Sequence, residues 1–218
     1  MRRRGRYLAS SEPWDVYMSG RLTGLTSEQK KYVTTQIYDR VYAICIDLGL
    51  RCYCPHKSET DPSKPSAHSK IWKVDFEKVT DAYALVAYVG LASTGVGQEI
   101  EFAREDPKRH GIKAIVLCER KNLNGLSRLT LGSPVVDDQI VFTEPQEIDD
   151  QLRRWLITVF SEKNLRAIAS EESWPVPDLE KMLAAFTLDV RAEAFRGLDS
   201  PITKAQWRQK RRELLSRR

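Results

Sequence analysis

The sequence lacks any apolar run that approaches the roughly 18 residues needed to cross a bilayer. Residues 1–13 (MRRRGRYLASSEP) also lack the apolar stretch of a signal peptide. These two absences predict a soluble protein of the cytoplasm that has no membrane partner. With 218 residues, 41% of them hydrophobic, the chain can still bury the core of one medium-sized domain.

Cysteine is also scarce, with four residues in the chain: Cys45, Cys52, Cys54 and Cys118. The first and the last lie in apolar segments and are expected to be small core residues. Four cysteines in an intracellular protein of this length do not predict a disulfide framework. The spacing of Cys52, Cys54 and His56 superficially resembles a metal cluster, but no fourth ligand is evident and Pro55 interrupts the strand. We therefore predict no metal site.

Two common nucleotide-binding motifs are missing as well. Neither GxGxxG, typical of dinucleotide-binding folds, nor the P-loop GxxxxGK[ST] matches the glycine-containing segments at residues 19–25 (SGRLTGL) and 95–99 (GVGQE). No base-reading module of a nucleic-acid-binding protein is visible. The first segment still suits a backbone that approaches a ligand closely, because Gly20 and Gly24 carry no side chain.

The formal net charge of +5 comes from the two ends of the chain. Eleven of the 35 basic residues lie in residues 2–6 and 204–218, and only one of the 30 acidic residues, Glu213, lies there. The central part is therefore mildly acidic. Basic ends can bind nucleic acid by neutralising phosphates, but we favour solvated tails or contacts within an oligomer.

The most informative stretch runs from Asp75 to Ala103 (DFEKVTDAYALVAYVGLASTGVGQEIEFA). Residues 84–89 are apolar on both faces, which is typical of a central parallel strand. Residues 95–97 are predicted to turn the chain into a helix with Glu99 in its first turn. This position is the carboxyl edge of the sheet, where open α/β sheets bind ligands. The helix dipole there favours an ionised carboxylate at neutral pH, which suits a nucleophile.

Asp75 offers a second carboxylate for the same edge of the sheet. It shares one predicted helix face with Phe76, Val79 and Ala82, and a βαβ unit could return it towards Glu99. Two carboxylates in one cleft can cleave glycosidic bonds through an oxocarbenium-like transition state. In the alternative interpretation, Glu99 only stabilises the helix dipole and Asp75 is a solvated charge.

Strands and helices alternate along the rest of the chain. We predict a helix from Ser27 to Leu48, with Ser27 as N-cap, and further strands at residues 15–18, 50–54, 113–118 and 139–143. The alternation predicts an α/β fold: a flavodoxin-like open five-stranded parallel sheet (order 2-1-3-4-5) with helices on both faces. In that order the strands at residues 15–18 and 84–89 are adjacent and parallel.

The chain is predicted to contain three parts. A basic tail covers residues 1–13, the catalytic domain covers residues 14–169, and a basic helical extension covers residues 170–218. The domain includes an amphipathic closing helix at residues 148–160. The extension should comprise a linker, a helix over residues 178–196 and a last basic helix, docked on the domain or on a second subunit because so short a segment makes a poor independent core.

Residues 55–69 form a polar, proline-bearing loop of the kind that often carries binding or lid residues. Trp72 follows the loop and either stacks on a nucleobase or belongs to the core.

The stretch from Asp75 to Ala103 resembles the 2'-deoxynucleoside 5'-phosphate N-hydrolases and their relatives, the nucleoside 2-deoxyribosyltransferases. That family carries an aspartate, an apolar strand, a Ser-x-Gly-Val-Gly-x-Glu run and a helical alanine, matched here by Asp75, Ser93, Gly95, Val96, Gly97, Glu99 and Ala103. The segment VYMSGRLTG also resembles the first strand and loop of the family, through Val16, Tyr17, Ser19, Gly20 and Gly24. The resemblance spans about residues 14–160.

This resemblance implies cleavage of the N-glycosidic bond of a nucleoside 5'-monophosphate. Glu99 would attack C1' of the sugar and form a glycosyl-enzyme. Asp75 would orient the sugar or handle a proton for the departing base, and Tyr17 would position Glu99 or the sugar. No metal or redox cofactor is needed. A homodimer or higher homo-oligomer is also implied, because Ser127 resembles a serine that reaches the phosphate of the neighbouring subunit's ligand.

A nucleotide is preferred over a nucleoside in this interpretation, because neither glycine segment carries an acidic residue before Glu99. A cation, hydroxyls and loop N–H groups make a phosphate-binding set. Arg21 stands where phage-type relatives of the transferases carry a proline. The alternatives are a nucleoside 2-deoxyribosyltransferase, an NAD glycohydrolase and a noncatalytic nucleotide sensor. The predicted substrate-binding residues are Ser19, Gly20, Arg21, Thr23, Ser93, Gly95, Gly97, Trp72 and Ser127.

Overall fold

The computed structural model of the chain describes residues 13–58, 60–62, 64–105, 111–171, 173–185, 209 and 212–213. The chain divides into two compact units, Met1–Ile148 and Asp149–Arg218. Most of the predicted basic tail and most of the predicted helices after residue 185 lie outside the described residues. The three-part division of the chain therefore stays a prediction.

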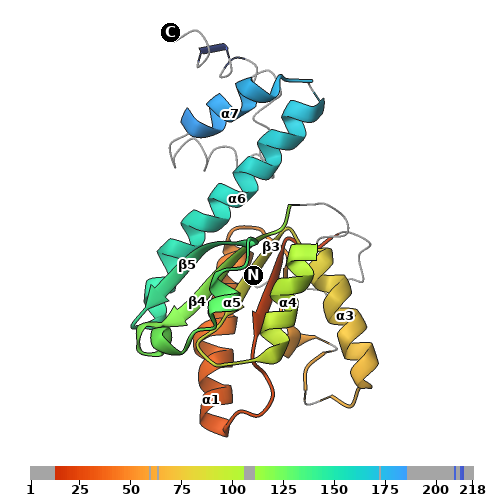
Figure 1. Ribbon diagram of the computed structural model, residues 1–218, viewed down its shortest axis with the longest axis vertical. Helices are drawn as coiled ribbons and strands as arrows, with labels where there is room; N and C mark the ends of the chain where they lie inside the picture. The colour runs from red at the N-terminus through yellow and green to blue at the C-terminus, as the bar shows by residue number, and fades with distance from the viewer. Residues whose placement is uncertain are drawn as a thin grey trace, which may run out of the picture. The chain divides into compact units, whose positions relative to one another are not determined.

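The N-terminal unit is built on a sheet of five parallel strands in the order β2-β1-β3-β4-β5 (Figure 1). β1 pairs with β3 in parallel, with Val16 opposite Ala84 and Gly20 opposite Tyr88. Both the predicted strand order and the predicted adjacency of these two strands are confirmed. The strands are Val16–Gly20 (β1), Cys52–Tyr53 (β2), Ala84–Tyr88 (β3), Lys113–Glu119 (β4) and Val136–Phe142 (β5).

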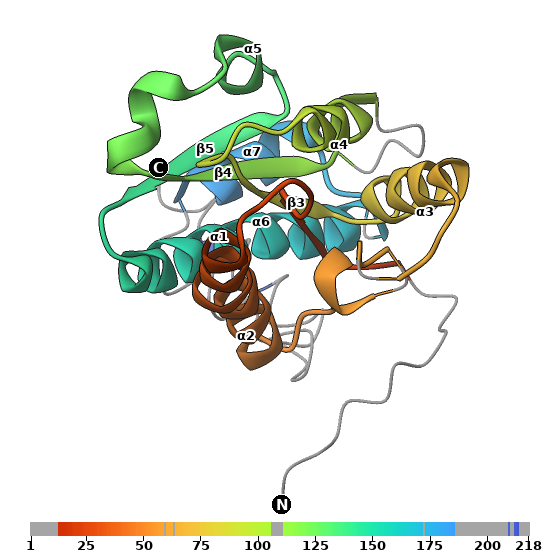
Figure 2. The same cartoon turned by 90° about the horizontal axis from the view of Figure 1, so that it is seen from below.

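Helices cover both faces of this sheet, as predicted. In Figure 2, α3 and α4 lie on one side of the strands, and α1 and α2 lie on the other. The helices are α1 (Ser27–Tyr32), η1 (Val33–Tyr38), α2 (Asp39–Asp47), α3 (His68–Thr80), α4 (Thr94–Glu105) and α5 (Arg128–Leu131), with short 3-10 turns at η2 (Pro55–Lys57), η3 (Arg120–Gly125) and η4 (Pro145–Glu147).

Strand alternation decides which side chains meet α3 and α4. Successive residues of a strand point to opposite faces. Tyr17, Leu85 and Ala87 accordingly belong to one buried cluster with residues of α3 and α4. The cluster includes Val79 from α3 and Ile100 and Ala103 from α4, and it packs both helices against the sheet.

The predicted strand at residues 50–54 is shorter than expected. Pairing with β1 is limited to Cys52 and Tyr53. Pro55 has no N–H to donate and begins the turn η2, so the strand cannot continue beyond it.

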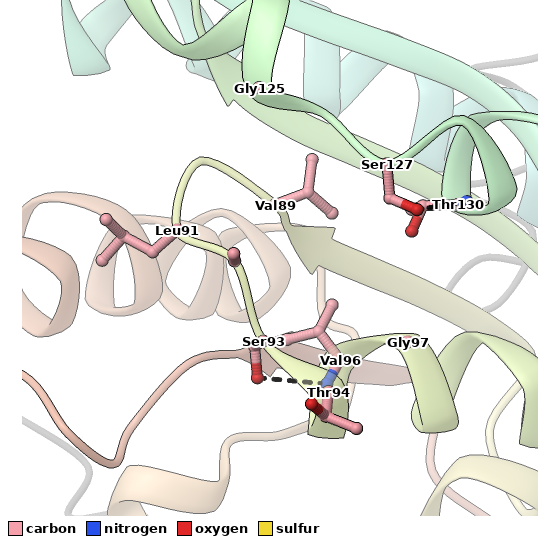
Figure 3. A pocket seen from close by; sticks show the side chains of 10 residues that line it. Val89, Leu91, Ser93, Thr94, Val96, Gly97, Gly125, Ser127 and Thr130 are labelled. Carbon is pink, nitrogen blue, oxygen red and sulfur yellow. Dashed lines mark hydrogen bonds between the residues drawn. The ribbon is translucent and has the colours of Figure 1, made fainter.

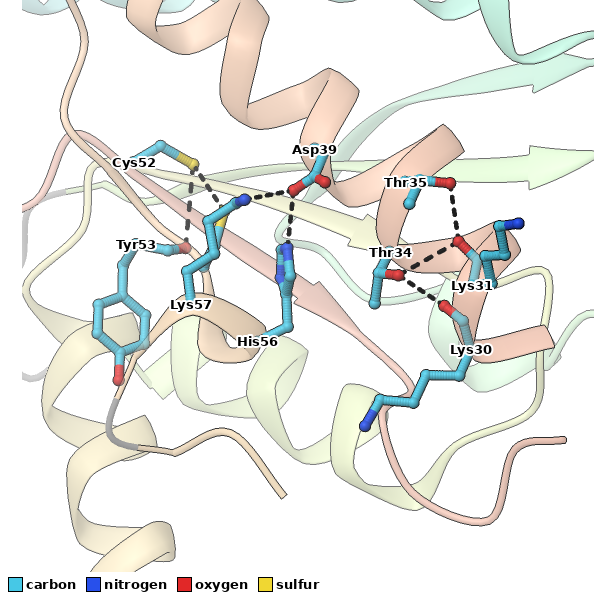
Figure 4. Close-up of polar contacts among 10 residues, drawn as sticks. Lys30, Lys31, Thr34, Thr35, Asp39, Cys52, Tyr53, His56 and Lys57 are labelled. Carbon is cyan, nitrogen blue, oxygen red and sulfur yellow. Dashed lines mark hydrogen bonds and ion pairs between the residues drawn. The ribbon is translucent and has the colours of Figure 1, made fainter. Parts of the chain in front are cut away.

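The first helix differs from its prediction in two ways. Thr26, not Ser27, is the N-cap, in a capping box with Gln29. The helix also widens into a π-helix at η1, where the Asp39 amide donates to the Thr34 carbonyl. At this junction the hydroxyls of Thr34 and Thr35 donate to the carbonyls of Lys30 (2.7 Å) and Lys31 (2.8 Å), respectively (Figure 4). These side-chain bonds satisfy carbonyls where the regular helical pattern changes.

The C-terminal unit contains most of α6 (Ile148–Glu171) and all of α7 (Val176–Ala185). An ion pair of 3.1 Å between Arg166 and Glu180 links the two helices. α6 extends well beyond the predicted end at residue 160, and α7 begins two residues before its predicted start. Among the described residues, no helix is both long and apolar enough to cross a membrane.

Candidate active site

Glu99 is held by two side chains from β1. The Tyr17 hydroxyl donates to Glu99 Oε1 at 2.8 Å, and the Ser19 hydroxyl donates to Oε2. Tyr17 and Ser19 are fully buried and stand two residues apart, so they project from the same face of the strand. Both carboxylate oxygens are therefore fixed by neutral donors before any ligand binds.

The surroundings of Glu99 differ from the prediction that the helix dipole keeps it ionised. α4 begins at Thr94, so Glu99 lies in the second turn, beyond the first turn in which the dipole acts most strongly. Burial raises the pKa of Glu99 to about 7, with a further increase from the charge of Asp75. The hydrogen bonds from Ser19 and Tyr17 lower this pKa but do not outweigh burial. Glu99 is therefore poised to titrate near neutral pH.

Gly95 and Gly97 are helical residues and do not form the predicted turn. The Val96 amide donates to Ser93 Oγ at 3.4 Å, which caps the start of α4 in the manner of an N-cap. A Cβ at Gly97 would meet no other atom within 4 Å, so Gly97 leaves open space beside the helix.

The structure brings the two predicted catalytic carboxylates to one cavity. Asp75 on α3 and Glu99 on α4 both line a space of about 230 Å³. The predicted return of Asp75 to this edge of the sheet is therefore observed. The two helices contribute matching stripes at positions i, i+3, i+4 and i+7: His68, Ile71, Trp72 and Asp75 from α3, and Gly95, Gln98, Glu99 and Phe102 from α4.

Trp72 belongs to an aromatic cluster at the edge of this cavity. Its ring stacks on Phe76, with centroids 5.3 Å apart and an interplanar angle of 4°, and meets Phe102 edge-on. Trp72 is nevertheless 50% exposed. It is therefore not a closed core residue, and part of its surface is accessible beside Glu99.

A second cavity, of about 400 Å³, lies at the start of α4 (Figure 3). Ser93 and Gly97 line it from the β3–α4 segment, and Ser127 and Thr130 line it from α5 and the residue before it. Ser127 is the N-cap of α5 and accepts from the Thr130 amide at 3.4 Å. Ser93 and Ser127 of the same chain thus share one cavity, next to the turn of α4 that carries Glu99.

Arg21 ties two loops together at the carboxyl edge of the sheet. Its guanidinium donates to the carbonyls of Thr23 (2.9 Å), Ala92 (3.2 Å) and Gly24 (3.0 Å). Gly24 has a φ of +64°, which glycine adopts without strain. A structural role for Arg21 is thus visible, and a guanidinium has five N–H donors, of which these bonds use three.

Gly20 is tightly packed against the side chain of Tyr38, a contact that the sequence did not predict. A Cβ at this position would lie 2.3 Å from the hydroxyl oxygen of Tyr38. The Tyr38 hydroxyl donates to the Arg21 carbonyl at 2.8 Å. Gly20 therefore makes room for the ring of Tyr38. Thr23, the neighbouring predicted binding residue, is exposed.

Cys52 and Cys54 contact each other, whereas His56 pairs with a carboxylate on a neighbouring helix. Cys52 Sγ and Cys54 Sγ lie 3.6 Å apart, whereas His56 Nε2 lies 3.0 Å from Asp39 Oδ1, which also pairs with Lys57 (Figure 4). Within the described ranges, no group of three or more His, Cys, Asp or Glu side chains could hold a metal ion.

Sequence reasoning missed Gln98, Phe102, His68 and Ile71 as lining residues. The sequence contained the signal, because helical spacing from Asp75 reaches His68 and Ile71, and helical spacing from Gly95 and Glu99 reaches Gln98 and Phe102. It could be used only once both stripes were known to face one cavity.

Comparisons with known proteins show likenesses to solved structures but to no family model. No family model matches the chain, and no curated protein sequence matches it. Among solved structures, the chain is similar to the CMP N-glycosidase BcmB of Clostridium botulinum, with 20% sequence identity and a TM-score of 0.46. The match covers 65% of this chain and 98% of that chain.

Proposed function

We propose that the protein hydrolyses the N-glycosidic bond of a nucleoside 5'-monophosphate, with Glu99 as the nucleophile. The observation that carries this proposal is the cavity that Glu99 shares with Asp75, in which Tyr17 and Ser19 fix both oxygens of Glu99. A fixed carboxylate that shares a cavity with a second carboxylate suits double displacement at a sugar carbon.

In the first step, an oxygen of ionised Glu99 attacks C1' of the sugar. The C1'–N bond breaks, its electron pair leaves with the base, and a glycosyl ester forms on Glu99. In the reactive state the two carboxyl groups share a single proton, which lies on Asp75 and passes to the departing base. In the second step, water attacks C1' and Asp75 accepts a proton from it. The ester bond to Glu99 breaks, the sugar phosphate is released, and Glu99 is again a free carboxylate.

The donors on Glu99 contribute to both steps. The Tyr17 and Ser19 hydroxyls lower the pKa of Glu99, which increases the fraction of the reactive carboxylate near neutral pH. Burial raises the pKa of Tyr17 well above its usual value, so its hydroxyl keeps its proton and stays a donor. The same donors stabilise Glu99 as a leaving carboxylate when water resolves the ester.

The exposed ring of Trp72 lies where it can stack on the departing base. The 5'-phosphate is assigned to the neighbouring cavity, where Ser93 and Ser127 offer hydroxyls and the first turn of α4 offers N–H groups. Arg21, bonded to Ala92 one residue before Ser93, places a positive charge at the same loop.

The test is incubation of the purified full chain with ribo- and deoxyribonucleoside 5'-monophosphates, the matching nucleosides and NAD, followed by chromatography for free base. Release of base from a monophosphate, faster than from its nucleoside, is expected. Faster turnover in the presence of a second free base would instead indicate a deoxyribosyltransferase, and release from NAD alone would indicate an NAD glycohydrolase. Tight nucleotide binding without base release over hours would refute catalysis and favour a sensor.

A further inference from the structure

A separate cavity of about 400 Å³ opens at the carboxyl ends of β3 and β4. We call it the Glu119 cavity. Tyr88 is the last residue of β3, and its neighbours Leu85 and Ala87 belong to the cluster under α3 and α4, so alternation directs Tyr88 to the face covered by α1. The cavity is lined by Tyr32, Val33, Tyr88, Leu91, Glu119 and Asn122, among others, and contains neither Asp75 nor Glu99.

Glu119 is only 3% exposed, although its side chain is a carboxylate. The Tyr88 hydroxyl donates to Oε1 at 2.6 Å and reaches Oε2 at 2.8 Å, and Asn122 Nδ2 donates to Oε2 at 3.3 Å. Burial and the neighbouring Glu119 carboxylate raise the pKa of the Tyr32 hydroxyl to about 12, so a third neutral donor lies near Glu119. All three donors are neutral, and among the described residues no Lys, Arg or His forms an ion pair with Glu119.

A carboxylate buried without a cation is costly, because neutral hydrogen bonds replace only part of its hydration. It offers about four acceptor positions, so the donors already present leave room for another. A ligand that brings both a positive charge and an N–H group would satisfy each of these needs.

The surrounding chain is shaped to keep the carboxylate in this place. A Cβ at Gly90 would lie 2.0 Å from Glu119 Oε2 and 2.6 Å from the Tyr88 hydroxyl oxygen, so only glycine fits there. Asn122 Nδ2 also donates to the Gly90 carbonyl at 2.9 Å, which ties the β3–α4 loop to the carboxylate. The π-helix η1 begins at Val33, at the wall of the cavity, and π-helical turns are frequent at functional sites.

The lining defines the chemistry of the ligand. Glu28 and Glu119 outnumber the single basic residue, Lys121, and the remaining wall is mostly aromatic and aliphatic. Aromatic faces attract cations, and a delocalised planar cation is more weakly hydrated than an ammonium ion. We propose that the Glu119 cavity is a second binding site, which takes a small organic cation with an amidinium or guanidinium head group paired to Glu119. This site does not depend on the glycosidase activity proposed above.

Benzamidine is the probe, and its neutral isostere benzamide is the matched ligand control. Isothermal titration of the full chain should show saturable one-to-one binding of benzamidine and affinity at least about tenfold lower for benzamide. Glu119→Gln should weaken benzamidine binding by at least about tenfold, whereas Glu99→Gln should leave it unchanged. Absence of saturable benzamidine binding, or equal affinity for the two ligands, would overturn the proposal.

If Glu119→Gln does not fold, charge changes at two exposed residues that line the Glu119 cavity still test the proposal. Glu28 and Lys121 are exposed, so their replacement should leave the fold intact. Lys121→Glu should strengthen benzamidine binding and Glu28→Lys should weaken it, each several-fold, and both effects should shrink at high salt. Lys70→Glu, an exposed site on α3, makes the same net-charge change elsewhere. Equal effects of Lys121→Glu and Lys70→Glu would contradict a site at Glu119.

Discussion

The hydroxyl of Tyr17 and the carboxylate of Glu99, 82 positions apart in the sequence, are joined by a hydrogen bond of 2.8 Å. One residue lies on β1 and the other on α4, so the bond depends on the packing of this helix over the first strand. Because the acceptor is the proposed nucleophile, the bond connects the fold directly to the chemistry.

Replacement of Glu99 gives the most direct test of its role. Glu99→Ala should lower kcat for base release by at least about a thousandfold, because no covalent intermediate can form without it. Glu101→Ala is the matched control, since Glu101 is an exposed carboxylate on the same helix, paired with Arg104. A loss of less than about tenfold for Glu99→Ala would exclude the nucleophile assignment.

The pH dependence of kcat/KM should follow the ionisation of Glu99. Its pKa of about 7 means that activity rises as the pH increases through neutrality, because only the carboxylate attacks. Tyr17→Phe and Ser19→Ala each remove a bond that lowers this pKa, so both should move the rising limb to higher pH. A pH–rate profile for each variant measures the shift, and an unchanged limb in both would show that another group controls the rate.

The same pKa predicts a stability cost at the site. In the unfolded chain Glu99 has an ordinary pKa of 4.5, and in the folded chain it is about 7. Between these values the folded state binds the extra proton, so this residue's contribution to the free energy of unfolding falls as the pH rises from 4.5 to 7. Glu99→Gln should therefore stabilise the protein by about 1–3 kcal/mol at pH 8 and have little effect at pH 4.5.

Denaturant unfolding at both pH values measures this difference. The Glu101→Gln variant should change stability little at either pH, because its carboxylate is exposed. An equal effect of Glu99→Gln at pH 4.5 and pH 8 would mean that packing, not ionisation, accounts for the change.

The sequence predicted the sheet correctly because its signals there are local. The apolar run at residues 84–89 indicates a buried strand whatever its neighbours are, and the alternation of strands and helices then restricts the topology. The meeting of Asp75 with Glu99 follows from that topology. The start of α4 was predicted too late, because glycine usually interrupts helices and Gly95 and Gly97 were therefore placed in a turn. The capping bond from the Val96 amide to Ser93, which allows the helix to begin before them, cannot be read from the spacing of the glycines.

Glu119 could not be recognised from its position in the sequence. A charged residue at the end of a strand normally indicates exposure, and its neighbours along the chain, Arg120 and Lys121, are exposed as expected. Its burial depends on Tyr88 and Tyr32, which are 31 and 87 positions away and become neighbours only through the tertiary fold. The desolvation of the partly buried Glu99 is likewise a tertiary effect, and it raises the pKa of Glu99, whereas the helix dipole alone would lower it.

Arg21→Ala should separate phosphate recognition from loop support. If the guanidinium also meets the 5'-phosphate, the variant raises KM for the nucleoside monophosphate much more than for the matching nucleoside. If Arg21 only holds the carbonyls of Thr23, Gly24 and Ala92, both substrates lose the same factor in kcat/KM. Steady-state kinetics on the substrate pair decides, and a larger loss on the nucleoside would reverse the proposed preference for nucleotides.

Mixing two inactive or weakened variants will show whether Ser127 acts within its own chain. The resemblance implied that this serine serves a neighbouring subunit, but Ser127 already lines the cavity of Ser93 and Gly97 in the same chain. We therefore expect Ser127→Ala to weaken nucleotide turnover. When Ser127→Ala and Glu99→Gln chains are unfolded and refolded together, the mixture should be no more active than the Ser127→Ala chains alone. Each chain would then carry one defect in its own site. If subunits exchanged Ser127, a mixed dimer would regain one intact site and activity would rise above that level. Refolding Ser127→Ala with wild-type chain in place of Glu99→Gln controls for recovery, and sedimentation velocity on the same samples reports whether oligomers form at all.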